Sequence, residues 1–216
     1  MRMATFQGVV VADICEARFA LSGTIAKVQK RIGDSVKRGE ILASLDRKLL
    51  QTELDRQLAD YEKTRAEFEI FQRKNPGEQS DIEKFTKDAR QAALNAAVKD
   101  VELAKYRLDQ ADLASPVNGV IADMSGLAPG LFVTPSGSPI SIANKESIRF
   151  VFDVHQEQIM QFLSSVHVRV RIHAINKEVD GNTAVPAVGK DGIFPIVCYL
   201  DDTNGLVPGM KGEATI

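Results

Sequence analysis

The chain has 216 residues, of which 44% are hydrophobic and 26% charged, and its formal net charge is −2 at pH 7. This composition is that of an ordinary globular protein, long enough for two compact β modules and an extended segment. The balanced charge gives no basic excess of the kind that binds nucleic acid. Residues 9 to 12 form an apolar run of only four, so the sequence shows neither a signal peptide nor a membrane span.

The first β pattern runs from residue 23 to residue 46 and is punctuated by glycines. Gly33 and Gly39 enclose Val36, and apolar residues return at positions 41 to 45. Glycine is favoured in turns that need a positive φ, because it has no Cβ to clash with the backbone. The pattern therefore predicts short strands joined by tight turns.

A long helical segment follows this pattern. Between residues 47 and 115 the only helix breakers are Pro76 and Gly77, although the whole chain contains 15 Gly and 8 Pro. The two arms, residues 47 to 74 and 81 to 112, would be roughly 40 to 48 Å long at a rise of 1.5 Å per residue. Such a rod is too long to fold into a small core.

Apolar residues recur every seven positions in both arms, which predicts a two-stranded antiparallel seam. They are Leu54, Tyr61 and Phe68 in the first arm, and Ile82, Ala89, Leu94, Ala96, Val101, Leu103 and Leu108 in the second. We expect the alanines between positions 89 and 97 to face the first arm and to leave room for its aromatic side chains.

The turn between the arms is marked on both sides. The sequence Asn-Pro-Gly at 75 to 77 ends the first arm, and Ser80 followed by Glu83 has the pattern of a capping box that opens the second. The spacing from Glu83 to Lys87 also predicts an ion pair on an exposed helix face. An antiparallel helical hairpin is therefore expected.

A looser copy of the first β pattern occupies residues 116 to 142. In this copy Val133 lies three residues after a turn glycine, as Val36 does in the first copy. The equivalent glycines Gly23 and Gly119 are 96 positions apart, which exceeds the period of tandem repeats. The two copies are therefore predicted to be halves of one β sandwich that the helical hairpin interrupts.

The last third of the chain predicts further strands. Residues 166 to 173 alternate strictly between apolar and polar, which is typical of a half-buried strand. Residues 156 to 165 carry apolar side chains at helix-like spacing, and residues 194 to 200 predict another strand. Residues 6 to 11, near the amino terminus, are expected to add a strand to the same module.

Together these patterns resemble the periplasmic adaptor family, whose members are also called membrane fusion proteins. The most specific pieces are Phe-Ala-Leu-Ser-Gly at 19 to 23, Gly-Asp-Ser-Val-Lys-Arg-Gly at 33 to 39, Ala-Ser-Pro-Val-Asn-Gly-Val-Ile at 114 to 121 and Leu-Val-Pro-Gly-Met-Lys-Gly at 206 to 212. The resemblance covers nearly the whole chain.

The resemblance implies a mainly β fold with an inserted α-helical hairpin, built from three modules in an elongated arrangement. Residues 1 to 12 and 146 to 216 would form a small β-barrel. Residues 13 to 46 and 113 to 145 would form a lipoyl-like sandwich in two halves, and residues 47 to 112 the hairpin.

The resemblance also implies a function as a non-catalytic adaptor. In this family the hairpin points toward an outer-membrane channel, while the barrel contacts an inner-membrane pump. We expect a proton-driven pump of the resistance-nodulation-division type, because the rod is short and single; an ATP-driven exporter is the alternative. The resemblance implies trimers or hexamers that form with these partners.

The resemblance further implies a periplasmic location at the inner membrane of a Gram-negative bacterium. Family members begin with a secretion signal or membrane anchor and end with a further membrane-proximal β domain. Neither is visible in this sequence, and we expect the chain to be a trimmed fragment that reaches the membrane through the missing segments.

Partner contact is expected at the hairpin tip. Channel-docking members carry Arg, then Leu four positions later, then Ser seven positions after that; here Ser80 fits, but Glu69 and Arg73 stand in the first two places. These two residues are also spaced for an ordinary ion pair. The candidate contact residues are Glu69, Arg73, Asn75, Pro76, Gly77, Glu78 and Ser80.

A different class of function would depend on Lys48. Lipoyl and biotinyl carrier domains present a modified lysine on the hairpin that joins their two halves, and Lys48 lies near that junction. The helical hairpin replaces the tight turn, however, and puts Lys48 in the first turn of a helix. A purely structural coiled-coil protein is a third class, but it would not need paired lipoyl-like halves.

No pattern in the sequence supports catalysis, a metal site or a cofactor. His167 and His173 are about 20 Å apart along an extended strand and cannot share one ion, and His155 is not joined to them by any metal-binding motif. Cys15 and Cys198 both lie in predicted strands, where they would be buried small side chains or, alternatively, a disulfide.

Overall fold

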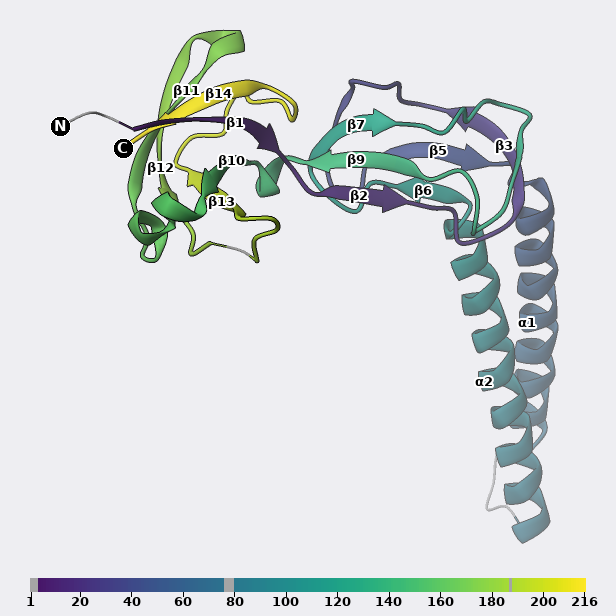
Figure 1. The fold of residues 1–216 in the computed structure, drawn as a ribbon. Helices are drawn as coiled ribbons and strands as arrows, with labels where there is room; N and C mark the ends of the chain where they lie inside the picture. The colour runs from purple at the N-terminus through teal and green to yellow at the C-terminus, as the bar shows by residue number, and fades with distance from the viewer. Residues whose placement is uncertain (1–3, 76–79, 187) are drawn as a thin grey trace.

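The computed structural model describes residues 4 to 75, 80 to 186 and 188 to 216. In space, the β-sandwich lies between a β-barrel and a helical hairpin. The hairpin axis points away from the line that joins the barrel and the sandwich (Figure 1). The predicted fold class, mainly β with an inserted helical hairpin, is confirmed. The sequence-derived domain limits at residues 12, 46, 112 and 145 stay a prediction.

The barrel closes with the strand order β1-β10-β13-β12-β11-β14, and all its neighbouring strands are antiparallel. Its strands are β1 (Thr5–Val11), β10 (Arg149–His155), β11 (His167–Ile172), β12 (Lys177–Thr183), β13 (Ile193–Leu200) and β14 (Lys211–Thr215). Because β1 pairs with both β10 and β14, the amino-terminal segment completes the barrel as predicted.

Aromatic side chains pack against one another in the barrel core. The Phe6 ring centroid lies 5.4 Å from that of Phe152 and 5.6 Å from that of Phe162, which it meets edge to face. Along β11 the predicted alternation is confirmed, with Val168 buried and Arg169 exposed. Burial of alternate residues along each strand therefore supplies the core, as expected for a small barrel.

Among the described residues, short 3-10 helices connect barrel strands or lead into them: η1 (Lys145–Ser147), η2 (Gln156–Phe162) and η3 (His173–Ile175). The second replaces the α-helix that the apolar spacing of residues 156 to 165 suggested. A 3-10 helix has three residues per turn, so Phe162 and Ile159 share one side. Phe162 is fully buried there, whereas Met160 turns to solvent.

The sandwich consists of two four-stranded sheets, ordered β2-β9-β7-β4 and β6-β5-β3-β8. Its strands are β2 (Ile14–Ala17), β3 (Gly23–Val28), β4 (Ser35–Val36), β5 (Ile41–Leu45), β6 (Asp112–Ala114), β7 (Gly119–Asp123), β8 (Phe132–Val133) and β9 (Ile140–Asn144). Each sheet contains strands from before and after the hairpin. The prediction that the two glycine-punctuated segments complete one module is therefore confirmed.

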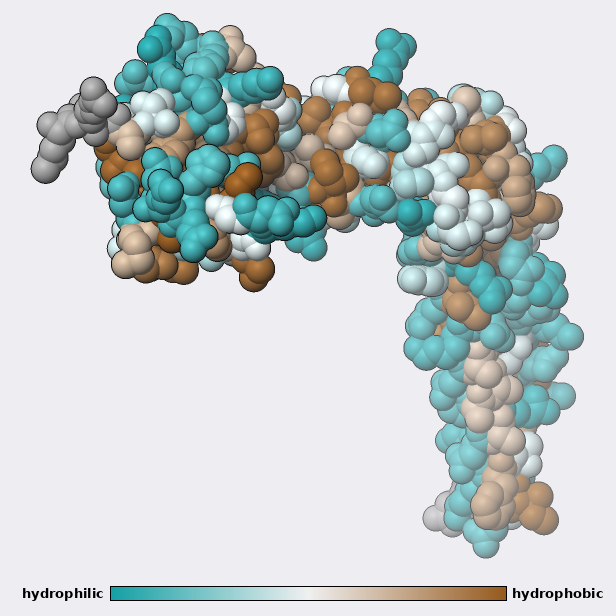
Figure 2. All heavy atoms as spheres, viewed as in Figure 1, coloured by the Kyte–Doolittle hydropathy of each residue, from teal (hydrophilic) through white to brown (hydrophobic). Residues whose placement is uncertain are grey.

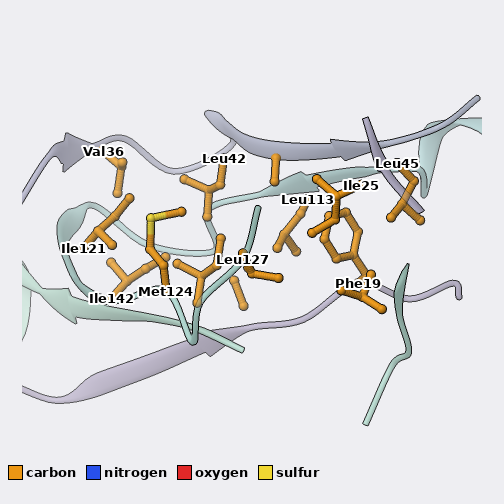
Figure 3. Close-up of a cluster of buried hydrophobic side chains, with 14 of the residues drawn as sticks. Phe19, Ile25, Val36, Leu42, Leu45, Leu113, Ile121, Met124, Leu127 and Ile142 are labelled. Atoms are coloured by element: carbon orange, nitrogen blue, oxygen red, sulfur yellow. The ribbon is translucent and has the colours of Figure 1, made fainter. Parts of the chain in front are cut away.

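The pairing shows how closely the two halves interlock. Gly23 on β3 is opposite Val133 on β8, and Val36 on β4 is opposite Gly119 on β7. Side chains from both halves, including Leu42 and Ile121, meet in one continuous core (Figure 3). Neither half has a core of its own.

The sandwich has an internal two-fold relation. Replacing β2, β3, β4 and β5 by β6, β7, β8 and β9 converts the strand order of one sheet into that of the other. Along the chain, β1 leads into β2 and β9 leads into β10, so the barrel is attached to the sandwich through β2 and β9. The hairpin is attached through β5, which leads into α1, and β6, which follows α2. The barrel and the hairpin are thus attached at equivalent positions and leave from opposite ends of the sandwich (Figure 1).

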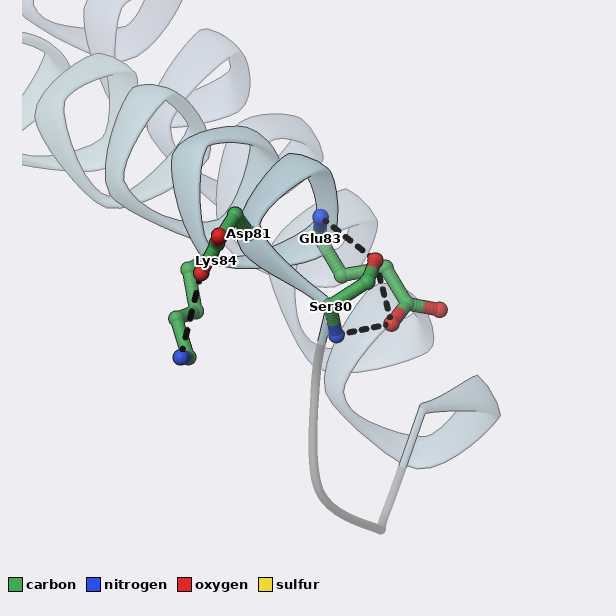
Figure 4. A network of polar contacts seen from close by, with 4 residues as sticks. All are labelled: Ser80, Asp81, Glu83 and Lys84. Atoms are coloured by element: carbon green, nitrogen blue, oxygen red, sulfur yellow. Dashed lines mark hydrogen bonds and ion pairs between the residues drawn. The ribbon is translucent and has the colours of Figure 1, made fainter.

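The hairpin consists of α1 (Lys48–Lys74) and α2 (Asp81–Asp109). The second arm is shorter than predicted, because Asp112–Ala114 forms β6 and pairs with β5. The predicted capping box is confirmed: the Ser80 hydroxyl accepts from the Glu83 amide at 3.4 Å, and the Glu83 carboxylate accepts from the Ser80 amide at 2.8 Å (Figure 4).

The expected role of the alanines in the hairpin is wrong. Ala89, Ala92, Ala93 and Ala96 are exposed, and the side of α2 turned to α1 instead carries Leu94, Ala97, Val101, Ala104 and Leu108. Both sets have apolar spacing, but Leu and Val bury more hydrocarbon than Ala does. Leu94, Val101 and Leu108 therefore take positions turned to α1, with Ala97 and Ala104 between them, and the other four alanines lie outside.

Candidate functional site

The predicted contact residues lie where the two helices end. Glu69 and Arg73 are in the last turns of α1, and Ser80 is the residue that caps α2. The Asn75 side-chain amide donates to the Phe71 carbonyl oxygen at 3.0 Å and so helps to close the last turn of α1. Pro76, Gly77 and Glu78, also predicted as contact residues, are outside the described residues.

The predicted ion pair between Glu69 and Arg73 does not form. Glu69 instead accepts from Arg65 Nε at 2.9 Å, and this hydrogen bond raises the pKa of Arg65 above its usual value. Arg73 lies in the last turn of α1, where the negative end of the helix dipole favours a cation.

The predicted pair between Glu83 and Lys87 is also absent. The carboxylate of Glu83 is held by Ser80 in the capping box, and Lys84 pairs with Asp81 at 3.4 Å (Figure 4). The capping box therefore takes the Glu83 carboxylate away from Lys87. The described residues next to the tip therefore include a cation, Arg73, at the end of α1 and the capping box of Ser80 at the start of α2.

Exposed apolar side chains also lie near the tip, and the sequence prediction does not include them among the candidate contact residues. Ile70, Ile82 and Phe85 are 53%, 79% and 74% exposed. Figure 2 shows a pale-brown column along the hairpin that ends in darker brown at the tip. The sequence carries a signal for them, because Ile82 belongs to a seven-residue repeat, but the same repeat also predicts a seam with the first arm.

The other candidate side chains do not come together as a chemical site. Within the parts of the chain that the structure describes, no group of three or more His, Cys, Asp or Glu residues could hold a metal ion. His167 and His173 point outward from the barrel, with Nε2 atoms 3.7 Å from Asp180 Oδ1 and 3.9 Å from Glu213 Oε2. Such pairs belong to a charged outer surface.

Lys48 is exposed and is the first residue of α1, as predicted. Its backbone amide donates to Asp46 Oδ1 at 2.9 Å, so the position is fixed as a helix start. A carrier domain presents its lysine on a tight turn between two strands, whereas here a long hairpin occupies that place. The geometry therefore disfavours modification at Lys48.

The two cysteines are free thiols, so the disulfide alternative is not adopted. Cys15 is half-buried on β2, and Cys198 is fully buried on β13. Burial raises the pKa of the Cys198 thiol to about 12, which leaves it neutral and unreactive in the folded barrel.

In the described parts of the chain, no helix combines the length and the hydropathy that crossing a membrane requires. Both long helices belong to the hairpin, and their surfaces carry many charged side chains. The ion pairs Arg56 to Glu53 and Lys99 to Glu102, at 2.9 and 2.7 Å, are examples.

No protein-family model matches the sequence. The chain is 22% identical over 211 residues to the nickel-cobalt-cadmium resistance protein NccB of Alcaligenes xylosoxydans xylosoxydans. That match covers 87% of this chain but only 50% of NccB, so the chain spans about half the length of this curated relative.

Solved structures share the fold over nearly the whole chain. A MacA-MexA chimeric protein with the α-hairpin domain of Pseudomonas aeruginosa MexA has a TM-score of 0.80 at 16% identity, covering 99% of this chain and 81% of the chimera. The membrane fusion protein Spr0693 from Streptococcus pneumoniae R6 has a TM-score of 0.73 at 14% identity, covering 98% and 97% of the two chains. The resemblance inferred from the sequence is thus confirmed in three dimensions, and the chain has the fold of the membrane fusion proteins, or periplasmic adaptors.

Proposed function

We propose that the chain is a non-catalytic periplasmic adaptor, which links an inner-membrane efflux pump to an outer-membrane channel. The observation that carries the proposal is the hairpin. Its helices of 27 and 29 residues project about 40 Å from the sandwich, at the end opposite the barrel. A protein with a rod at one end and a β-barrel at the other is suited to contact two partners that are far apart.

The barrel is proposed to contact the pump, and the hairpin tip to contact the channel. Near the tip, Ile82 and Phe85 are exposed in the first turns of α2 and Arg73 lies in the last turn of α1; apolar side chains and arginine are both common at protein interfaces. The register of Glu69 and Arg73 differs from the Arg and Leu of channel-docking adaptors, which favours a channel partner with a different contact pattern. The protein would act in the periplasm, associated with the inner membrane.

The substrate is proposed to be a transition-metal cation, and the pump to be of the resistance-nodulation-division type. Similarity to a nickel-cobalt-cadmium resistance protein supports the metal substrate. The short, single hairpin supports the pump type. An adaptor needs no metal site of its own for this role, because the pump and the channel provide the path.

The test is an export assay in cells that depend on this adaptor. The charge of Arg73 or of Glu78 is reversed, or residues 76 to 79 are deleted, and efflux of nickel, cobalt, cadmium and a set of drugs is measured. Circular dichroism of each purified variant checks that the helices persist. Export should be strongly reduced by the deletion and by at least one reversal.

A matched charge reversal far from the tip serves as the control. Lys27 is exposed on β3 of the sandwich, and Lys27→Glu should leave export unchanged. If export survives both tip reversals and the deletion, docking through the tip is wrong. If drugs are exported and metals are not, the metal assignment is wrong while the adaptor function stands.

A further inference from the structure

An asparagine followed by a glycine is a chemically labile pair, and the sequence contains it twice, at 118–119 and at 204–205. The backbone nitrogen that follows an asparagine can attack the side-chain Cγ and close a five-membered ring. A glycine in that place favours the attack, because it has no Cβ to shield the nitrogen or to restrict rotation of the peptide. Whether a pair reacts in the folded protein therefore depends on how firmly both groups are held.

The first pair is held by several bonds. Asn118 Oδ1 accepts from the Arg38 amide at 3.0 Å, and Asn118 Nδ2 donates to Glu146 Oε1 at 2.7 Å. Gly119 is buried at the start of β7, where it pairs with β4 on one side and with β9 on the other. Ring closure at Asn118 would have to break these hydrogen bonds together with the strand pairing, so the fold protects this pair.

The second pair lies in an exposed turn. Asn204 and Gly205 are both exposed, and they are the middle residues of a turn that the Leu206 amide closes by donating to the Thr203 carbonyl oxygen at 3.1 Å. Gly205 has a φ of 79°, a conformation that glycine adopts without strain. Neither residue of the pair belongs to a strand, so the peptide between them can rotate without breaking the pairing of the barrel.

A cation contacts this peptide. Lys177 Nζ donates to the Asn204 carbonyl oxygen at 2.9 Å and to Asp202 Oδ2 at 2.7 Å. The Asn204 carbonyl belongs to the same peptide unit as the Gly205 nitrogen. When that nitrogen loses its proton, much of the negative charge moves to the carbonyl oxygen, where an ammonium group stabilises it. Lys177 therefore makes the Gly205 proton easier to remove.

One carboxylate opposes this effect. Asp202 Oδ1 accepts from the Asn204 amide at 2.9 Å, one peptide unit before the reacting one. The hydrogen bond from Lys177 lowers the pKa of Asp202, so this carboxylate is charged at neutral pH. Its charge is paired with Lys177, whereas the carbonyl oxygen of the reacting peptide is bonded to the cation itself. The direct contact with the cation therefore has the larger effect on the reacting peptide.

We propose that Asn204 is a site of spontaneous deamidation, which Lys177 promotes. The Gly205 nitrogen gives its proton to hydroxide and attacks Cγ of Asn204. The new N–Cγ bond forms as the bond from Cγ to Nδ2 breaks, and Nδ2 takes a proton from water and leaves as ammonia. Water then opens the ring at either carbonyl carbon and leaves isoaspartate or aspartate. The net reaction consumes water and releases ammonia, without oxidation or reduction.

The modified turn differs in charge and, for isoaspartate, in chain length. A new carboxylate joins Asp201 and Asp202, of which Lys177 pairs with Asp202. Isoaspartate also places the side-chain CH2 in the backbone, which disrupts the turn that the Leu206 amide closes. This turn leads from β13 to β14, and β14 lies between β11 and β1 in the barrel. We therefore expect the modification to weaken closure of the barrel.

Peptide mass spectrometry of the purified chain, aged in a mildly alkaline buffer, measures both pairs in one sample. Deamidation replaces an amide by a carboxyl group and so changes the peptide mass, whereas isomerisation at an Asp-Gly pair does not. Asn204 should react at least about tenfold faster than Asn118, because Asn118 must first be released by local opening. Equal rates, or a faster reaction at Asn118, would overturn the proposal.

The same measurement in guanidinium chloride shows whether the difference comes from the fold. In the unfolded chain both asparagines simply precede a glycine, so their rates should converge. A difference that persists after unfolding would assign the contrast to the neighbouring sequence and would overturn the structural argument. Asn204→Gln, whose longer side chain closes a ring much more slowly, should abolish the mass change in this peptide and so verifies the assignment.

Lysine variants test the promoting group. Lys177→Met should slow deamidation of Asn204 about threefold in the folded protein and should have no effect in guanidinium chloride. Lys177→Arg keeps a cation and should keep most of the rate. Lys27→Met, which removes an exposed charge from the sandwich, is the matched control and should react like the wild type.

Thermal unfolding of each lysine variant verifies that the barrel is folded before the rates are compared. An unchanged or faster reaction in folded Lys177→Met would overturn the role of Lys177. These measurements involve neither a pump nor a channel, so their outcome is independent of the proposed adaptor function.

Discussion

The sandwich and the hairpin use opposite means to become ordered. The sandwich buries one continuous core, drawn from segments on both sides of the hairpin in sequence. Among the hairpin residues that the structure describes, only Phe68 and Ala104 are buried. The comparison shows that the sandwich is stabilised by one shared core, whereas the hairpin depends on local helix formation and on the contact between its two helices.

Replacing one leucine by alanine in each region should give the largest difference in the free energy of unfolding between the sandwich and the hairpin. Leu42 is fully buried in the sandwich and Leu94 is half-buried between the helices. Leu42→Ala should lower the free energy of unfolding by about 3 kcal/mol, because it leaves a cavity that cannot collapse. Leu94→Ala should cost about 1 kcal/mol, since much of this side chain is already in water.

Hydrogen exchange of peptides from β5 and from α2, followed in increasing urea, measures the two losses separately. The Leu42 variant should accelerate exchange throughout both sheets, and the Leu94 variant only within the hairpin. Equal losses in the two variants would mean that the hairpin has a core of its own and that the contrast between the regions is wrong.

The two equivalent glycines of the sandwich, Gly23 and Gly119, should differ in how much stability is lost when each is replaced by alanine. A Cβ on Gly119 would lie 2.3 Å from the Ala143 carbonyl oxygen, whereas on Gly23 it would meet Leu45 Cδ1 at 3.2 Å. Neither glycine has a positive φ, so the difference is steric. Gly119→Ala should cost about 2 to 3 kcal/mol and Gly23→Ala less than about 1 kcal/mol in thermal unfolding.

The reason for this asymmetry is the close approach of two backbones. The backbone of β9 cannot move without disturbing its pairing with β2 and β7, whereas the end of the Leu45 side chain can rotate. Similar costs for the two substitutions would show that the sandwich adjusts more freely than its packing suggests.

The helix start at Ser80 tests the local part of hairpin stability. Ser80→Ala removes the acceptor for the Glu83 amide and should cost about 1 kcal/mol. Hydrogen exchange should become faster in the first turn of α2 and remain unchanged in the sandwich. Ser80→Asp, which retains a capping oxygen, is the matched control and should preserve the protection.

Thiol chemistry reports on the β modules alone, because the hairpin contains no cysteine. At neutral pH Cys15 should react with iodoacetamide in the folded protein, and Cys198 only after the barrel opens. The folded pKa of Cys198 is raised to about 12 from an ordinary 9. Its contribution to barrel stability is therefore complete below pH 9 and is lost as the pH rises toward 12.

Thermal unfolding of the wild type and of Cys198→Ala between pH 8 and pH 11 measures this loss. The stability of the wild type should fall more steeply with pH than that of the variant. Parallel curves would show that the thiol is not kept neutral by the barrel.

The features predicted well from the sequence are those fixed by short-range chemistry. The Ser80 capping box, the alternation along β11 and the glycine turns of the sandwich all depend on residues that are close in sequence or on a clear period. The sequence also predicts that the two glycine-punctuated segments complete one β sandwich, because each segment carries the strand and turn pattern of only half a sandwich.

The features predicted wrongly involve a choice between two apolar sets or two partners. Helix α2 has two stripes of suitable spacing, and only packing against α1 decides that Leu94 faces inward and Ala92 outward. Glu69 has an arginine four residues away on either side, and it pairs with Arg65. Spacing alone cannot rank such alternatives, because their order depends on the area buried and on the geometry of the folded helix.

The attachment of the hairpin to neighbouring strands makes it an exchangeable part. Where it leaves and re-enters the sandwich, the Leu45 amide donates to the Ala111 carbonyl oxygen at 2.8 Å, and Ser44 Oγ donates to Asp112 Oδ1 at 2.7 Å. These bonds hold the two ends together whatever lies between them. A helical segment of another length can be grafted there without redesigning the β modules, so the reach of the molecule can change in evolution while its fold is retained.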